Sequence, residues 1–127
     1  MSIERLDFSK FEGELVPVIA QDYKTDEILM LTFANKEAVR QSLETGIACY
    51  YSRSRKKLWK KGEESGHFQE IQQVFIDCFM DTILLKVKQK VAACHTGFYS
   101  CFHREYVDGS LITQGKPVFN PEDVYKK

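Results

Sequence analysis

Three cysteines in the second half of the chain have polar neighbours and could together hold a metal ion. Cys78 follows an aspartate, Cys94 precedes a histidine, and Cys101 follows a serine. Three thiolates with an open fourth position form a zinc site that can activate water. Their spacing does not match a CxxC knuckle, so buried or surface thiols remain the alternative at this point. Cys49 lies in a run typical of a strand and is interpreted as a core residue.

Two histidines are candidates for moving protons. His95 adjoins Cys94, and His67 ends a Ser-Gly-His run. Histidine titrates near neutral pH and suits general acid–base work on a metal-bound water. We take both as candidate catalytic residues, although an isolated histidine is more often a structural residue.

A basic segment in the middle of the chain combines cations, hydroxyls and aromatic rings. Six of the 18 basic residues fall within residues 53–61, a stretch that contains no acidic residue. Arginine can bind phosphate through two hydrogen bonds, serine adds donors, and tryptophan can stack on a base. The segment predicts a site for a nucleotide or another anion, and the alternative is a solvated charged loop. The candidate substrate-binding residues are Ser52, Arg53, Ser54, Arg55, Trp59 and Lys61.

The composition excludes several classes of protein. The 127 residues carry 18 basic and 18 acidic side chains, whereas nucleic-acid binding normally needs a broadly basic domain. No apolar run approaches the ~20 residues of a membrane helix, and the acidic N-terminus does not resemble a signal peptide. The motifs GxGxxG, GxxxxGK[ST] and HxE with PCxxC are absent. We expect a cytoplasmic protein with a small-molecule ligand, and no contact with nucleic acid or membrane.

The first half of the chain predicts the elements that lead to the basic segment. Residues 3–11 are compatible with a short helix. Residues 16–20 and 28–33 are apolar strand runs around a polar turn, which predicts a hairpin. Asn35 is a suitable N-cap, and Gly46 is placed to end the helix that follows it.

The second half of the chain predicts mainly strands. Residues 47–53, 74–78 and 82–87 are rich in β-favouring residues. This order predicts an α+β fold with a mainly antiparallel sheet, one principal helix, and hairpins in preference to crossovers. Residues 1–127 suffice for one small domain, and the last twenty residues look loosely attached.

Several runs together resemble the phosphoribosyl-AMP cyclohydrolase family of histidine biosynthesis. The resemblance covers residues 15 to about 106, and its most specific run is SRSRKKLWKKGEESGH at 52–67. That family hydrolyses the N1–C6 bond of the adenine ring in phosphoribosyl-AMP, and it works as a homodimer with zinc sites built from both subunits. The resemblance implies the same reaction here, in an intertwined homodimer. The other matching runs are LVPVIAQDYKT (15–25), ETGIACYY (44–51), DC (77–78), DTILLKV (81–87) and CHTG…SCF (94–102).

The resemblance also implies roles for the cysteines and histidines. Cys78 of one subunit matches a zinc ligand, and Cys94 and Cys101 of the other subunit match the remaining two. His95, beside a ligand, is the implied proton carrier, and His67 lies in the family's substrate-binding region.

The chain departs from the family pattern where the chemistry takes place. In place of the family's magnesium motif Asp-Cys-Asp-x-Asp, this chain has DCFMD at 77–81. The Phe79-Met80 pair therefore leaves the motif without its middle carboxylate. On an extended strand Asp77 and Asp81 would lie ~13 Å apart, and we expect at most weak Mg²⁺ binding, assisted by substrate phosphates. Tyr99 stands at a position where the family usually has an arginine. Two alternatives follow, a paralogue with another nucleotide substrate and a non-catalytic nucleotide-binding zinc dimer.

Overall fold

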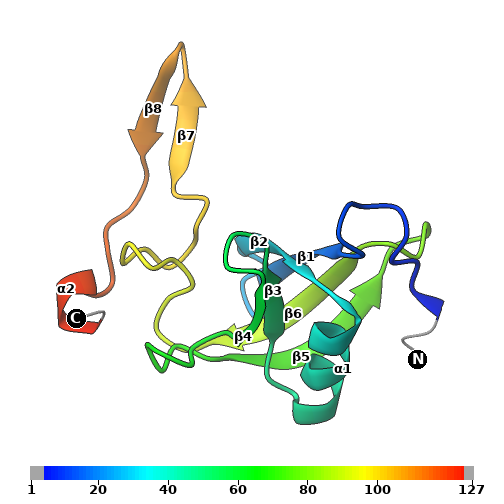
Figure 1. Cartoon of the computed structure of the whole chain (residues 1–127). Coiled ribbons are helices and arrows are strands. Elements are labelled where there is room, and N and C mark those ends of the chain that lie inside the picture. The colour runs from blue at the N-terminus through cyan, green and yellow to red at the C-terminus, as the bar shows by residue number, and fades with distance from the viewer. Residues whose placement is uncertain (1–4, 125–127) are drawn as a thin grey trace.

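A four-stranded sheet in the order β2-β1-β6-β5 forms the centre of the computed structural model, which describes residues 5–124 (Figure 1). β1 (Val16–Asp22) pairs antiparallel with β2 (Ile28–Ala34), and β5 (Gln69–Ile76) pairs antiparallel with β6 (Ile83–Gln89). The predicted α+β class, the mainly antiparallel sheet and the first hairpin are therefore confirmed.

The predicted preference for hairpins over crossovers is wrong at the centre of the sheet, where β1 and β6 run parallel. Both strands bury every second residue, so each needs a neighbour that continues the apolar face. Pairing β1 with β6 joins the two hairpins into one sheet with a continuous core. Such a non-local pairing cannot be read from short connections.

The helix α1 (Lys36–Thr45) covers one face of the sheet and begins and ends where the sequence predicts. The Asn35 side chain accepts a hydrogen bond from the backbone N–H of Ala38 at 2.8 Å. Gly46 adopts the left-handed conformation at φ 77° and ends the helix. The buried side of α1 presents Ala38, Val39 and Ser42 to the core.

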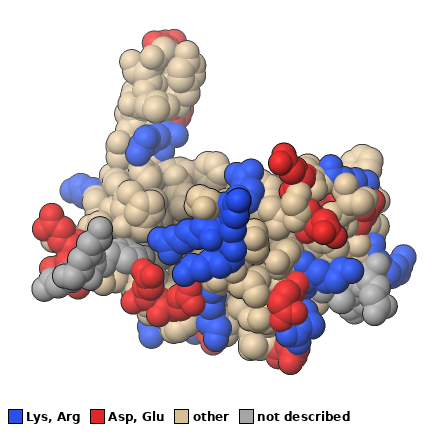
Figure 2. Space-filling model, in the orientation of Figure 1, with Lys and Arg blue, Asp and Glu red and all other residues tan. Residues whose placement is uncertain are grey.

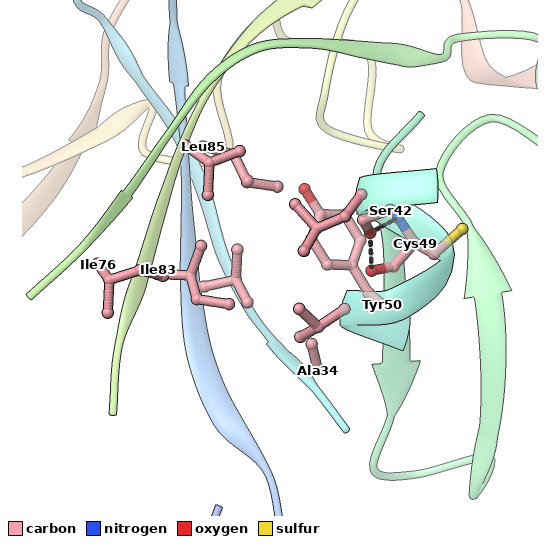
Figure 3. A pocket seen from close by; sticks show the side chains of 11 residues that line it. Ala34, Ser42, Cys49, Tyr50, Ile76, Ile83 and Leu85 are labelled. Atoms are coloured by element: carbon pink, nitrogen blue, oxygen red, sulfur yellow. Dashed lines mark hydrogen bonds between the residues drawn. The ribbon is translucent and has the colours of Figure 1, made fainter. Parts of the chain in front are cut away.

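A small apolar cavity lies between α1 and the sheet (Figure 3). Its volume of about 20 Å³ has room for about one water molecule. The Ser42 hydroxyl lies at the edge of this cavity and accepts a hydrogen bond from the backbone N–H of Cys49 at 2.8 Å. Cys49 is buried, as predicted for a core residue. The cavity is too small to be a substrate site.

A second hairpin, β3 (Cys49–Ser52) with β4 (Lys57–Lys60), contains the basic segment. The predicted strand at 47–53 is confirmed, but the sequence does not predict β4, because its charged residues resemble a loop. Tyr50 and Trp59 are cross-strand partners with ring centroids 5.4 Å apart. This aromatic pair gives the charged strand an apolar neighbour and holds its register.

The two ends of the described chain differ from expectation. Residues 3 and 4 lie outside the described residues, and residues 6–11 form turns instead of a helix. There the Ser9 N–H donates to the Asp7 carboxylate at 2.9 Å, a local bond that competes with helix formation. Within residues 5–124 no helix is long and apolar enough to cross a membrane.

The last elements project from the body and then return to it (Figure 1). β7 (Arg104–Val107) and β8 (Ser110–Thr113) form a hairpin that extends away from the sheet. The chain then leads to α2 (Pro121–Val124), and on the way the N–H of Val118 donates to the carbonyl of Gly97 at 2.7 Å. Among the described residues of this end, the hairpin is the loosely attached part, and the following segment packs on residues near Cys94.

Candidate active site

One large pocket of about 820 Å³ lies between β2, the β3–β4 hairpin and the loop that follows β6. All six candidate substrate-binding residues line it, together with His95 and Cys101. The pocket has the volume of a site for a drug-sized or nucleotide-sized ligand. The structure therefore brings the basic segment, one candidate catalytic histidine and one candidate zinc ligand to the same space.

The β3–β4 hairpin supplies the positive charge of this pocket. Figure 2 shows Lys and Arg side chains gathered in the middle of the body. The Arg53 guanidinium carbon lies 3.9 Å from the centroid of the Phe33 ring, and this stacking aligns the guanidinium with the pocket wall. The backbone N–H of Arg55 donates to the Ser52 hydroxyl at 3.2 Å, which closes the turn. The hairpin can therefore offer an anion two guanidinium groups on a defined turn.

Lys61 differs from the other basic residues because it is buried. Its Nζ donates to the carbonyl of Ala93 at 2.6 Å, which joins the end of β4 to the loop that contains Cys94. Burial lowers the pKa of Lys61, and the neighbouring thiols of Cys101 and Cys94 oppose that effect. The sequence assigns Lys61 to substrate binding, and in the structure it lines the pocket with one of its N–H groups donated to Ala93.

Cys94 and Cys101 lie side by side at the pocket wall, with Cys101 lining the pocket and Cys94 buried. Cys94 is buried, with its Sγ 2.9 Å from the Thr96 Oγ1, and the N–H of Cys101 donates to the Leu29 carbonyl of β2 at 2.7 Å. Desolvation and the hydrogen-bonded Cys94 thiol raise the pKa of Cys101 to about 11. Two adjacent thiols are chemically suited to a thiophilic metal ion, which would displace their protons and bind the thiolates.

Cys78 lies at the opposite end of the sheet from this pair. It follows the Ile76–Ile83 end of the β5–β6 ladder, whereas Cys94 follows the Gln69–Gln89 end. Seven residues of β6 separate the two ends, about 20 Å at the rise of a strand. In residues 5–124 no three Cys, His, Asp or Glu side chains are grouped as metal ligands. One chain therefore does not bring the three candidate zinc ligands together.

His67 lies behind the pocket instead of on its wall. It is buried, its ring packs edge-on against Phe119 at 4.7 Å between centroids, and its Nδ1 has no hydrogen-bond partner within residues 5–124. Burial lowers the pKa of His67, with Lys61 and Lys90 adding to the effect. The two candidate catalytic histidines are thus in different environments, and only His95 lines the pocket.

A buried polar network supports the loop before Cys94, and sequence reasoning missed it. The Tyr50 hydroxyl donates to Gln69, whose Nε2 donates to the Gln89 side chain at 2.8 Å. The Gln89 Nε2 in turn lies 3.2 Å from the carbonyl of Ala92 and donates to it. Glutamines inside two strand runs are the only sequence signal of this network. It fixes the backbone next to Ala93, the residue that Lys61 also holds.

Comparisons with known proteins identify relatives of this chain. A model of the phosphoribosyl-AMP cyclohydrolase family matches residues 30–103. The phosphoribosyl-AMP cyclohydrolase of Methanococcoides burtonii is 54% identical over 94% of this chain and 98% of its own length, and that of Methanoregula boonei is 56% identical over 91% and 92%. A histidine biosynthesis bifunctional protein of Thermoanaerobacter pseudethanolicus is 54% identical over 92% of this chain and 55% of its own length.

Proposed function

Because the chain belongs to the phosphoribosyl-AMP cyclohydrolase family, we propose that it hydrolyses the N1–C6 bond of the adenine ring of phosphoribosyl-AMP in histidine biosynthesis. The observation that supports this proposal most directly is the shared pocket, where the basic hairpin, Trp59, His95 and Cys101 line one space. The pocket offers cations for phosphate, an aromatic ring for the base, and a histidine beside the thiol pair.

The substrate would bind with its phosphate groups at the hairpin turn. Arg53 and Arg55 carry the guanidinium groups that suit phosphate oxygens, and Ser52 and Ser54 supply hydroxyl donors. The Trp59 ring, held by Tyr50, offers a face for stacking. Lys61 would act as a positioning residue, because its buried ammonium donates to the carbonyl of Ala93 and so connects β4 to the loop that contains Cys94.

We infer that zinc is held by Cys94 and Cys101 of one chain and Cys78 of a second chain. The adjacent thiol pair and the position of Cys78 beyond the far end of β6 support a site shared between two copies. A zinc ion there would supply Lewis-acid chemistry and lower the pKa of water. His95, on the pocket wall one residue from Cys94, would carry the proton to or from the reacting ring.

The projecting hairpin also supports the homodimer. Tyr106 and Leu111 are 72% and 63% exposed and face each other across β7 and β8. An exposed apolar pair on an extended arm offers a surface that could pack on another chain. Figure 2 shows uncharged surface along the middle of the arm, with acidic atoms at its tip and charged side chains near its base. We infer that the arm packs on the second chain that supplies Cys78.

Turnover of phosphoribosyl-AMP by reduced, zinc-loaded protein tests the proposed reaction, with ring opening followed by ultraviolet absorbance. We expect turnover by the wild type and a loss of about 100-fold or more in His95→Ala with its zinc retained. His103→Ala is the matched control, because His103 stacks on Phe98 and does not line the pocket. No turnover by zinc-loaded wild type would contradict the proposed reaction, and equal turnover by His95→Ala would remove that residue from it.

A further inference from the structure

The turn between β5 and β6 holds the two carboxylates that the family resemblance connects with magnesium. Asp77 is engaged within the turn: its Oδ1 accepts from the backbone N–H groups of Asp81 at 3.1 Å and Thr82 at 3.2 Å. The backbone N–H of Asp77 also donates to the Thr82 carbonyl at 3.1 Å. The Asp77 carboxylate therefore closes the turn that presents Cys78, and one of its two oxygens, Oδ1, is occupied by the backbone.

Asp81, the second carboxylate, already has a cation. The Lys10 ammonium lies 3.2 Å from the Asp81 Oδ2 and donates to the carbonyl of Phe79 at 3.1 Å. It also lies 5.6 Å from the centroid of the Phe79 ring. A carboxylate oxygen, a carbonyl oxygen and a ring face are three groups that attract a cation. The ammonium of Lys10 thus occupies a small cation site.

The surrounding chain reinforces this contact. The backbone N–H of Asp7 donates to the Met80 carbonyl at 2.7 Å, so residues 7–10 are attached to the turn at two points. The Asp81 side chain is only 13% exposed, although its partner Lys10 is 41% exposed. The contact is therefore partly shielded from water, and salt screening is weaker there than for a fully exposed ion pair.

The residues in this turn do not fit a magnesium ion. Mg²⁺ requires near-ideal octahedral oxygen coordination at about 2.0–2.1 Å. Here Asp77 is turned to the backbone, Phe79 supplies a ring in place of a carboxylate, and Asp81 is paired with Lys10. A divalent cation at Asp81 would also meet the positive charge of the ammonium at close range.

We propose that the Lys10 ammonium replaces a divalent cation in the 77–82 turn and thereby positions Cys78. The replacement of the cation does not depend on the proposed reaction, because it concerns the 77–82 turn in the substrate-free protein. The positioning of Cys78 rests on the proposed shared zinc site. The two parts therefore have separate measurements.

Manganese is the probe for the first part, because Mn²⁺ resembles Mg²⁺ in its ligands and is visible by electron paramagnetic resonance. Zinc-loaded wild type is titrated with Mn²⁺ beside Asp81→Asn. We expect the same binding curve for both proteins, since Asp81 is already paired. About one Mn²⁺ per chain that is lost in Asp81→Asn would overturn the proposal. A triple variant, Lys10→Met with Phe79→Asp and Met80→Gly, is expected to gain Mn²⁺ binding, and no gain would also overturn it.

Zinc release to a colorimetric chelator measures the second part. In Lys10→Met we expect zinc to be released about tenfold faster, because the Cys78 turn loses its attachment. Lys86→Met is the matched control, since Lys86 pairs with Asp26 at 2.9 Å on another part of the surface. Equal release from both variants would overturn the positioning role. Loss of turnover in Lys10→Met with unchanged zinc release would overturn the positioning role as well, whereas no turnover by zinc-loaded wild type would count against the proposed reaction alone.

Discussion

Tyr99 stands where the family pattern has an arginine, but its hydroxyl does not face the pocket. It donates to the Asp22 carboxylate, which also accepts the backbone N–H groups of Lys24 at 2.8 Å and Thr25 at 3.1 Å. Asp22 is buried at the end of β1, where it closes the β1–β2 turn. Tyr99 therefore stabilises the sheet, and a direct contact with phosphate is not its role in this arrangement.

The Tyr99–Asp22 contact predicts a pH-dependent contribution to stability. Desolvation alone would raise the pKa of Asp22, but the hydrogen bonds from Tyr99, Lys24 and Thr25 outweigh it and the pKa is lowered from 3.8. A lowered pKa stabilises the fold above the ordinary pKa, and this stabilisation is lost as the pH falls through the lowered value. We expect Tyr99→Phe to reduce the free energy of unfolding by about 2 kcal/mol at pH 7, and by less below pH ~4.

Urea denaturation of Tyr99→Phe and wild type at pH 7, 5 and 3 measures this difference. Tyr23→Phe is the control, because Tyr23 is exposed. A cost in Tyr99→Phe that stays the same from pH 7 to pH 3 would mean that the Asp22 charge contributes nothing to the contact.

The sequence predicts which residues lie near the pocket more successfully than it predicts the contacts that each of them makes. The substrate-binding candidates all lie within residues 52–61, so one hairpin brings them together. Lys60 and Lys61 are adjacent and look alike in the sequence, yet only Lys61 is buried. The position at which the chain leaves β4 decides which of the two lysine side chains is buried. No local sequence pattern determines that position. Residues 30–33 of β2 also line the pocket, but in sequence an apolar strand is indistinguishable from core.

At the scale of elements, the segment after β8 holds the turn that contains Cys94 and His95. The N–H of Val118 donates to the Gly97 carbonyl, and Phe119 packs against His67. Gly97 has φ +105°, and a Cβ there would lie 2.6 Å from the carbonyl oxygen of Phe119. The absence of a side chain at Gly97 therefore permits the close approach of the two backbones.

Gly97→Ala is expected to loosen the turn that holds Cys94. The added methyl group would push residues 117–121 away from the turn, because a backbone oxygen at 2.6 Å cannot rotate aside. We expect the melting temperature to fall by several degrees, in line with about 2 kcal/mol or more, and zinc to be released faster. Gly115→Ala is the matched control: it has φ +74° and open space around its Cβ position, so it carries the backbone strain alone. Equal effects of the two substitutions on melting and zinc release would refute a specific role for this approach.

The elements that local signals define were predictable, and those that depend on distant partners were not. The Asn35 cap, the Gly46 terminator and the strand runs before them act within a few residues, so the sequence reveals them. The parallel contact of β1 with β6 joins segments some sixty residues apart, as the Val18–Ile83 pair illustrates. The charged strand β4 forms because Trp59 packs against Tyr50 and the core, and such tertiary contacts are not part of local propensity.

At the scale of the whole molecule, the proposed dimer makes a quantitative prediction for mixed chains. Cys78→Ser and Cys94→Ser are each expected to be inactive, because every shared site lacks one ligand. When the two variants are mixed and allowed to exchange, a heterodimer contains one intact site and one site with both changes. Random exchange makes about half of the dimers heterodimers, so we expect about a quarter of wild-type turnover and zinc content.

Zinc content and turnover of the mixture, after partial unfolding and refolding together, measure this recovery. Cys94→Ser mixed with Cys101→Ser is the control, because both ligands come from the same chain and no combination restores a site. Equal recovery in the two mixtures would contradict the shared site. Recovery in neither mixture would mean that Cys78 does not complete a site with the other pair.

The position of Cys78 beyond one end of β6, with the other two cysteines beyond the opposite end, bears on how activity depends on the supply of the protein. If each site needs two chains, a lone chain is inert and activity appears only after two of them meet. Below the dissociation constant of the dimer, halving the number of chains would then remove about three quarters of the activity. A dilution series of the enzyme would show this as a quadratic dependence, and the cell would experience it as a threshold in gene dosage.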